Sequence, residues 1–341
     1  MAAHLDFDYL HRLALSDADH RVLDRVEGDR ARLLRHERLP EPGEYMELRL
    51  RPPGGAEHPA AAAGTEVPAG AVGAGVGAAA AESSITLVLR SDLAPASLDT
   101  FIEIFRDGAH TAVGGFAEFD RRFAGNDTRT VVDLGANEGY YTLLMKRLNA
   151  GLRVVAVEPL AENVDLFRRN VAANGLENVT CIEAAVTSAG RIPGGDAPVD
   201  TGTGRTQGTI RLETYPHVGT VASTDIAAFP RPWIDPARVR PRRVNAITLP
   251  ALLDQAGVGE ADILKVDVEG SEVDVLSGAA EAPAGSGATA TADVLRRFRR
   301  IVVECHGTEK REQVLAVLGR AGFVPVHIEG KRSGDVYAER R

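Results

Sequence analysis

Short, mostly apolar runs alternate with amphipathic segments through the second half of the chain. The apolar runs occupy residues 130–134, 153–157, 179–182, 263–268 and 301–303. Segments with apolar residues at helical spacing lie between and after them, at 141–148, 161–174 and 313–321. Buried strands that alternate with helices are typical of a parallel sheet covered on both faces. The pattern therefore predicts a doubly wound α/β domain over residues 130–341, whose last two strands, 323–328 and 335–338, are close enough in sequence to pair antiparallel.

The N-terminal part is patterned less regularly. Residues 1–52 contain a charged, helix-prone stretch that ends before Pro40 and Pro42. Residues 53–83 are almost entirely Ala, Gly and Pro without Lys or Arg, so we expect a low-complexity linker. Residues 84–129 lead into the α/β domain through a predicted strand at 85–89 and a short helix at 100–106.

Two segments interrupt the rhythm of the α/β domain. Residues 187–243 form a long, Gly- and Pro-rich insertion, and residues 281–291 are of low complexity. Long irregular insertions in a compact domain are usually functional lids or disordered loops, and we expect one or the other here.

Composition excludes several classes of protein. The two cysteines, Cys181 and Cys305, exclude a disulfide framework and a cysteine-based zinc site. A formal net charge of −9 disfavours nucleic acid as a partner. The first residues show no signal-peptide pattern, and no stretch approaches the ~20 apolar residues of a membrane span. We therefore expect a cytoplasmic protein with no membrane partner; its oligomeric state stays open.

The sharpest local signal is a strand that ends in a glycine-bearing turn and opens a helix, residues 130–142. Gly135 and Gly139 allow a tight turn and a close approach of the backbone to a ligand. Glu158 ends the next strand, where a carboxylate can accept hydrogen bonds from both hydroxyls of a ribose. This order of elements predicts a site for a nucleoside-containing cofactor.

The residues around Gly135 indicate which cofactor. Asn137 replaces the middle glycine of a dinucleotide fingerprint, and Asp133 would repel a pyrophosphate. S-adenosylmethionine carries an ammonium and a sulfonium and no phosphate, so it suits this turn better than NAD. Two alternatives remain: an NAD(P)-dependent oxidoreductase with an aberrant turn, and a non-catalytic cofactor-binding protein whose N-terminal segment docks a partner.

A second strand-to-helix block, residues 262–276, carries ionisable residues on one face. Strand alternation places Lys265, Asp267 and Glu269 together. Three ionisable groups are costly to bury along a central strand, which favours a functional site over a structural one.

The chain resembles the FkbM family of S-adenosylmethionine-dependent methyltransferases. The resemblance is carried by DLGANEGYYT (133–142), VEP (157–159), ENVDLFRRNVAANGLENV (162–179), LKVDVEGSE (264–272) and VVECH (302–306). It covers residues 130–340 and implies a Rossmann-like class I methyltransferase sheet of seven strands, the last antiparallel. It also implies O-methylation of a hydroxyl on a small natural-product or sugar-like metabolite.

The resemblance further implies a role for each residue of the two blocks. Residues around the methionyl part of the cofactor would be Asp133, Gly135, Asn137, Gly139 and Tyr140. Glu158 would hold the ribose, Ala184 would border the adenine, and Asp267 would lie near the transferring methyl group.

Methyl transfer to a hydroxyl also needs a general base, which we expect at the carboxyl ends of the strands. The candidates are His306, Asp267, Glu269 and Glu304. Glu304 and His306 share strand parity and could form half of a metal site with Asp267. No tight ligand spacing supports that reading, so we expect no metal.

Overall fold

The computed structural model describes residues 5–34, 44–51, 84–110, 129–192, 199–200, 205–206, 208–215, 218–223, 234–278, 292–330 and 334–341. The linker predicted at 53–83, the low-complexity segment 281–291 and parts of the 187–243 insertion lie outside these residues. No helix in the described ranges is long and apolar enough to cross a membrane.

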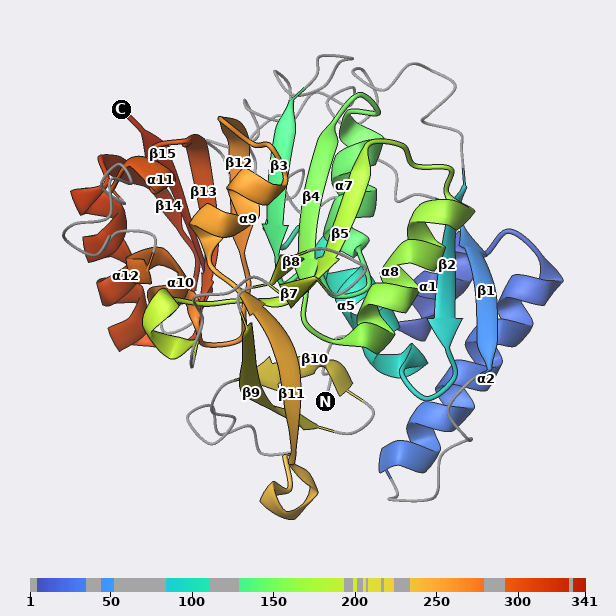
Figure 1. Cartoon of the computed structure of the whole chain (residues 1–341). Coiled ribbons are helices and arrows are strands. Elements are labelled where there is room, and N and C mark those ends of the chain that lie inside the picture. The colour runs from blue at the N-terminus through green and yellow to red at the C-terminus, as the bar shows by residue number, and fades with distance from the viewer. Residues whose placement is uncertain are drawn as a thin grey trace.

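A seven-stranded, mostly parallel sheet forms the centre of the molecule (Figure 1). Its order is β14 (Phe323–Ile328), β15 (Gly334–Arg340), β13 (Phe298–Cys305), β12 (Ala261–Val266), β3 (Thr130–Leu134), β4 (Arg153–Glu158) and β5 (Val179–Glu183). Strands β13, β12, β3, β4 and β5 are mutually parallel, and β15 pairs antiparallel with both β13 and β14. The predicted doubly wound sheet with an antiparallel last strand is confirmed.

Helices cover both faces of the sheet because its strands alternate two sets of apolar side chains. One set, which includes Val132, Val155 and Leu264, belongs to a core with four helices: α9 (Leu249–Gln255), α10 (Glu272–Gly278), α11 (Ala292–Leu295) and α12 (Thr308–Arg320). The opposite set, which includes Val131 and Val154, packs with α5 (Ala94–Phe105) and α7 (Tyr140–Leu148). Helix α8 (Ala161–Ala173) follows β4.

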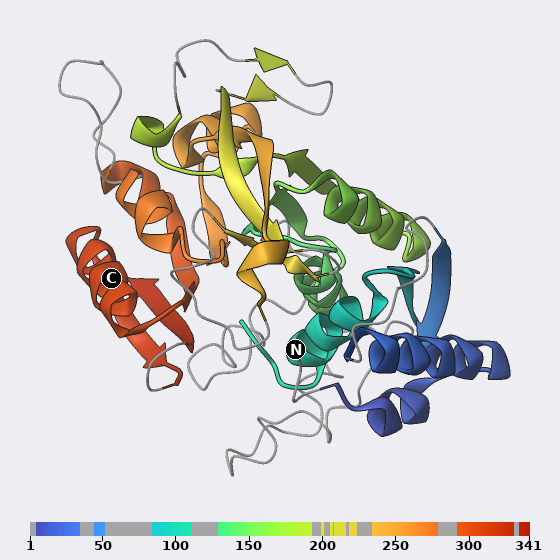
Figure 2. The same ribbon diagram turned by 90° about the horizontal axis from the view of Figure 1, so that it is seen from below.

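The N-terminal elements share this second core with the sheet. They are α1 (Phe7–Leu13), α2 (Asp17–Leu34) and the antiparallel pair β1 (Tyr45–Leu50) and β2 (Ile85–Arg90). Buried Leu10, Leu48 and Leu87 belong to the same cluster as Val131 of the central sheet. Figure 2 shows α1 and α2 at one end of the molecule and α12 at the other.

The described part of the 187–243 insertion contains regular strands, which its Gly and Pro content did not predict. A second sheet has the order β10 (Val218–Ser223), β9 (Gly208–Tyr215), β11 (Arg240–Ile247) and β6 (Ala185–Val186). The short strands β7 (Val199–Asp200) and β8 (Arg205–Thr206) pair with each other. Figure 1 shows the second sheet beyond the carboxyl ends of the parallel strands. Ile210 and Val244 of this sheet pack against Leu160, which follows β4, so the insertion borders the edge where the predicted site lies.

Candidate active site

The turn after β3 requires glycine for steric reasons. Gly135 and Gly139 have φ of 75° and 90°, in the left-handed region that residues with a side chain rarely adopt. A Cβ atom added to Gly135 would lie 1.7 Å from the carbonyl oxygen of Asp267. The backbone N–H groups of Gly135 and Ala136 both donate to the carbonyl oxygen of Val157 at 3.0 Å, which holds the turn beside the end of β4.

Asn137, in the middle of the turn, presents an acceptor to its surroundings. Its backbone is also left-handed, with φ of 48°. Its side-chain Oδ1 is buried and accepts no hydrogen bond from the described residues. A buried polar atom without a partner is costly, so this oxygen marks a place where a ligand donor fits.

Glu158, the last residue of β4, is a buried carboxylate that retains acceptor capacity. Its Oε2 accepts from the backbone N–H of Asn137 at 3.0 Å. Its Oε1 accepts from the backbone N–H of Leu160 at 3.0 Å and from the Asn163 side-chain amide at 3.1 Å. Burial raises the pKa of Glu158 to about 7, although these donors oppose the shift. A carboxylate has about four acceptor positions, so a further donor can be accommodated.

Tyr140 and Ala184 occupy different surroundings from each other. The Tyr140 side chain is buried against Phe101, and its hydroxyl donates to Glu138 Oε2 at 2.8 Å. Its ring therefore belongs to the core, and only its backbone lies at the start of α7.

Ala184 is fully buried between β5 and β6, and its N–H donates to the carbonyl oxygen of Glu158 at 3.1 Å. Ala184 thus lies next to the expected ribose-binding residue.

Lys265 on β12 joins the glycine turn to the second block. Its Nζ lies 3.3 Å from Asp133 Oδ1 and 3.3 Å from Asp267 Oδ2. Burial opposes the charge of Lys265, but the two aspartates outweigh it and raise the pKa of the ammonium. Burial alone would raise the pKa of Asp267, but the charge of Lys265 and the contact with His110 outweigh it and hold that pKa well below its ordinary value. Lys265 and Asp267 therefore form a charged pair at neutral pH.

His306, which follows β13, is surrounded by carboxylates. Its Nδ1 lies 2.8 Å from Glu272 Oε1, and its Nε2 lies 3.4 Å from Glu269 Oε2. The Nε2 atom is also 3.6 Å from Glu304 Oε1. Carboxylates only accept, so this arrangement favours an imidazolium that carries a proton on both nitrogens. Burial opposes this charge, but the glutamates raise the pKa of His306 to about 10.

The structure thus brings the predicted residues Asp267, Glu269, Glu304 and His306 together at the carboxyl ends of β12 and β13. Burial, followed by the charge of Asp267, raises the pKa of Glu304 well above its ordinary value. Glu269 has φ of 47°, a left-handed conformation that is costly for a residue with a side chain.

Three members of this cluster were missed by sequence reasoning. Glu272 is the last residue of the LKVDVEGSE motif, which carries the family resemblance. The motif alone did not identify Glu272 as a candidate site residue. His110 and Asp335 have no motif around them. His110 lies between the side chains of Asp335 and Asp267, with Nδ1 3.0 Å from Asp335 Oδ2 and Nε2 3.6 Å from Asp267 Oδ2.

Comparisons with known proteins indicate which family the chain is similar to. Residues 133–325 match the family model of the methyltransferase FkbM domain. The methyltransferase sdnD of Sordaria araneosa is 29% identical over 199 residues, which are 57% of this chain and 73% of sdnD.

Two solved structures are similar at low identity. Precorrin-6y C5,15-methyltransferase from Geobacter metallireducens GS-15 has a TM-score of 0.35 and 12% identity, over 66% of this chain and 87% of that one. Fibrillarin from Aeropyrum pernix, solved with natively bound S-adenosyl-L-methionine, has a TM-score of 0.33 and 12% identity, over 62% of this chain and 65% of that one. The family assignment rests on the sequence match.

Proposed function

Because the chain belongs to the FkbM family of S-adenosylmethionine-dependent methyltransferases, we propose that it methylates a hydroxyl oxygen of a small natural-product or sugar-like metabolite. The observation that carries this proposal is the contact between two groups of residues. Lys265 links the glycine turn, which fits the cofactor, to the carboxylates and imidazoles at the ends of β12 and β13. Family membership favours this reading over an oxidoreductase and over a non-catalytic binding protein.

The residues of the turn suit S-adenosylmethionine, whose sulfonium supplies an electrophilic methyl group. The orphan Oδ1 of Asn137 offers an acceptor for the cofactor's ammonium, beside the backbone of Gly135 and Gly139. Glu158 would accept from a ribose hydroxyl, and Ala184 next to it would border the adenine. Asp133 is fully buried, so we assign it to holding the turn through Lys265.

The carboxylates of the cluster suit a hydroxyl acceptor, because a hydroxyl must lose its proton to become a good nucleophile. The acceptor oxygen forms its bond to the methyl carbon while the bond from that carbon to sulfur breaks, and the hydroxyl proton passes to a carboxylate. Both nitrogens of His306 face carboxylates, so its ring offers no lone pair for this proton. We therefore assign proton acceptance to Glu269 and a positioning role to His306.

Two features support a small-molecule acceptor over nucleic acid. The cluster holds more carboxylates than cations, and the net charge of the chain is −9. A polyanionic phosphate backbone would be repelled from such an edge.

The proposal is tested by incubating the full chain with methyl-labelled S-adenosylmethionine and a panel of hydroxylated and amine-bearing metabolites. We expect the label on an oxygen atom, detected by mass spectrometry. Glu269→Gln should lower kcat about 10²- to 10⁴-fold while the affinity for S-adenosylhomocysteine changes little. Glu312→Gln, on the exposed surface of α12, is the matched control. Exclusive labelling of amines, or a Glu269→Gln variant with wild-type turnover, would contradict the proposal.

A further inference from the structure

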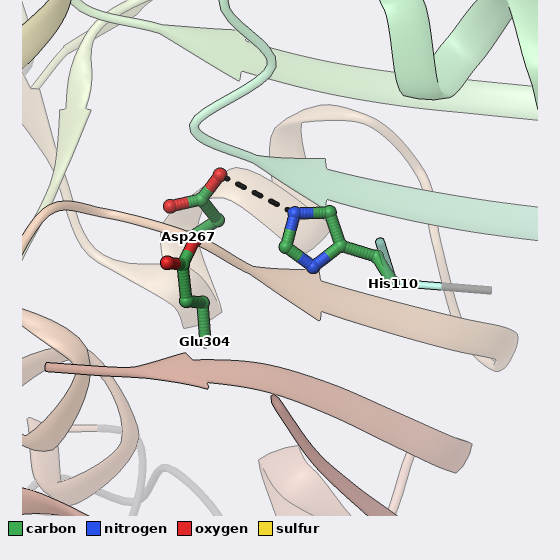
Figure 3. A group of neighbouring side chains, drawn as sticks. All are labelled: His110, Asp267 and Glu304. Atoms are coloured by element: carbon green, nitrogen blue, oxygen red, sulfur yellow. Dashed lines mark ion pairs between the residues drawn. The ribbon is translucent and has the colours of Figure 1, made fainter. Parts of the chain in front are cut away.

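Three potential metal ligands from distant parts of the chain converge beside the proposed acceptor site. They are His110, after α5, Asp267, after β12, and Glu304 in β13 (Figure 3). One ligand atom from each lies within 4.8 Å of the other two. Neighbouring ligands on a cation with bonds of ~2.1 Å are roughly 3.0–3.5 Å apart. The 3.6 Å between His110 Nε2 and Asp267 Oδ2 is close to that spacing.

His110 is held in the orientation that a metal ligand needs. Its Nδ1 and its backbone N–H both contact the Asp335 carboxylate, at 3.0 and 2.9 Å from Oδ2. The hydroxyl of Tyr337 donates to the same carboxylate at 2.9 Å, which fixes Asp335 in turn. Histidine ligands of metals commonly place their second nitrogen against such a carboxylate, which sets the tautomer and the ring direction.

The other nitrogen of His110 points toward Asp267 (Figure 3). The His110 side chain is only 7% exposed, and 3.6 Å to Asp267 is longer than a hydrogen bond. Nε2 is thus paired with Asp267 at ion-pair distance. A metal ion that binds between His110 and the two carboxylates would replace this long contact with shorter ligand bonds.

The charges around this position also favour a cation. Three carboxylates, those of Asp133, Asp267 and Asp335, share two basic side chains. Lys265 contacts Asp133 and Asp267, and His110 contacts Asp267 and Asp335. Glu304 adds a further carboxylate, whose partner His306 also faces Glu269 and Glu272. An added divalent cation would offset this excess of negative charge.

From these observations we propose that His110, Asp267 and Glu304 bind a divalent transition-metal ion, with Mn²⁺ as the probe of choice. One imidazole and two carboxylates, with no thiolate, form a mixed nitrogen and oxygen set that suits Mn²⁺, Fe²⁺ or Zn²⁺. Three protein ligands leave coordination positions open, which is the arrangement of catalytic sites.

The role of the ion rests on the proposed function. An acceptor hydroxyl on an open position would lose its proton more easily, because a metal ion lowers the pKa of a bound hydroxyl. Glu269 lies near the same cluster, on the Nε2 side of His306, and remains available to accept that proton.

The binding is tested by titrating Mn²⁺ into the full chain without cofactor or acceptor, by calorimetry and by the electron paramagnetic resonance signal of free Mn²⁺. We expect one ion per chain, with affinity reduced at least tenfold in His110→Gln and in Glu304→Gln. Asp335→Asn should weaken binding about 10- to 100-fold although it removes no ligand. His20→Gln on α2 and Glu312→Gln on α12 are the controls and should bind as the wild type does.

Circular dichroism and thermal unfolding establish that each variant is folded. If His110→Gln fails to fold, Glu304→Gln, whose side chain is 29% exposed, is the deciding variant. No binding at millimolar Mn²⁺, or wild-type affinity in Glu304→Gln, would overturn the metal site. A protonated His110 that bridges Asp267 and Asp335 without a metal would then explain the geometry.

The catalytic role of the ion is tested separately from its binding. Methyl transfer should stop in EDTA and return with Mn²⁺, and an unchanged rate in EDTA would overturn that role. Failure of the proposed function has a different signature: the Mn²⁺-loaded enzyme would bind its metal and methylate no hydroxyl.

Discussion

Lys265 Nζ donates a 2.8 Å hydrogen bond to the carbonyl oxygen of Gly135, and so joins β12 to the turn that follows β3. The same ammonium balances the carboxylates of Asp133 and Asp267. One buried cation therefore positions the proposed cofactor turn relative to the proposed acceptor site. A displacement of the Lys265 ammonium would therefore disturb both the turn and the acceptor site.

Replacement of Lys265 by methionine should destabilise the protein strongly. The change leaves Asp133, which is fully buried, without its cation, and such a broken pair costs about 3–5 kcal/mol. Urea unfolding should show this loss as a lower midpoint. The double variant Lys265→Met, Asp133→Asn removes the stranded charge and should recover part of the stability. A loss below ~1 kcal/mol in the single variant would show that the pair is not what holds the turn.

Alanine at Gly135 and alanine at Gly175 should have very different effects. Both glycines have positive φ, 75° and 61°, so each change strains the backbone by about 1–2 kcal/mol. Only at Gly135 does the new Cβ meet another atom, 1.7 Å from the Asp267 carbonyl oxygen, whereas at Gly175 nothing lies within 4 Å. We expect Gly135→Ala to unfold at clearly lower urea than Gly175→Ala and to lose cofactor binding. Equal midpoints would contradict the close approach of the turn to β12.

Cofactor affinity should depend on pH through Glu158. Its pKa of about 7 means that the carboxylate is largely protonated below neutral pH, and a ribose hydroxyl donates best to the ionised form. The affinity for S-adenosylhomocysteine should therefore rise between pH 6 and pH 8 and level off above that range. Calorimetry on the wild type and on Glu158→Gln is the measurement. The variant should bind more weakly at pH 8, and its affinity should lose the pH dependence.

The same shift has a consequence for stability without the cofactor. A carboxyl whose pKa is raised on folding stabilises the native state only while it is protonated. Its contribution is therefore complete below the unfolded pKa, near 4.5, and is lost as the pH rises to about 7. Glu158→Gln should flatten that decline in the unfolding midpoint. If the unfolding midpoint of Glu158→Gln falls with pH as steeply as that of the wild type, other buried carboxyls cause the decline.

Much of the fold could be predicted from local patterns. The central strands are short apolar runs, and each lies within a few residues of its predicted position because burial on both faces demands continuous apolar sequence. The helix predicted at 100–106 in fact begins at Ala94, because Pro95 stands in its first turn, where proline needs no N–H partner. Strand β1 was missed although its side chains alternate strictly between exposed and buried.

The strands of the 187–243 insertion were missed for a different reason. Strand β11 contains Pro241 and several arginines, which count against a strand in isolation. It forms because β9 and β6 are there to pair with it. Pairing partners that lie far away in sequence leave no trace in local composition.

The sequence by itself determined the parts of this protein whose chemistry is local. The glycine turn, the acid at the end of β4 and the alternation of Lys265, Asp267 and Glu269 follow from backbone sterics and strand periodicity within a few residues. Tertiary structure alone decided that His110 and Asp335 meet Asp267, and that His306 faces three carboxylates. These contacts depend on how whole elements pack, so His306, which was expected to accept a proton, lies among carboxylates that raise its pKa, and His110, which has no motif around it, lies between Asp267 and Asp335.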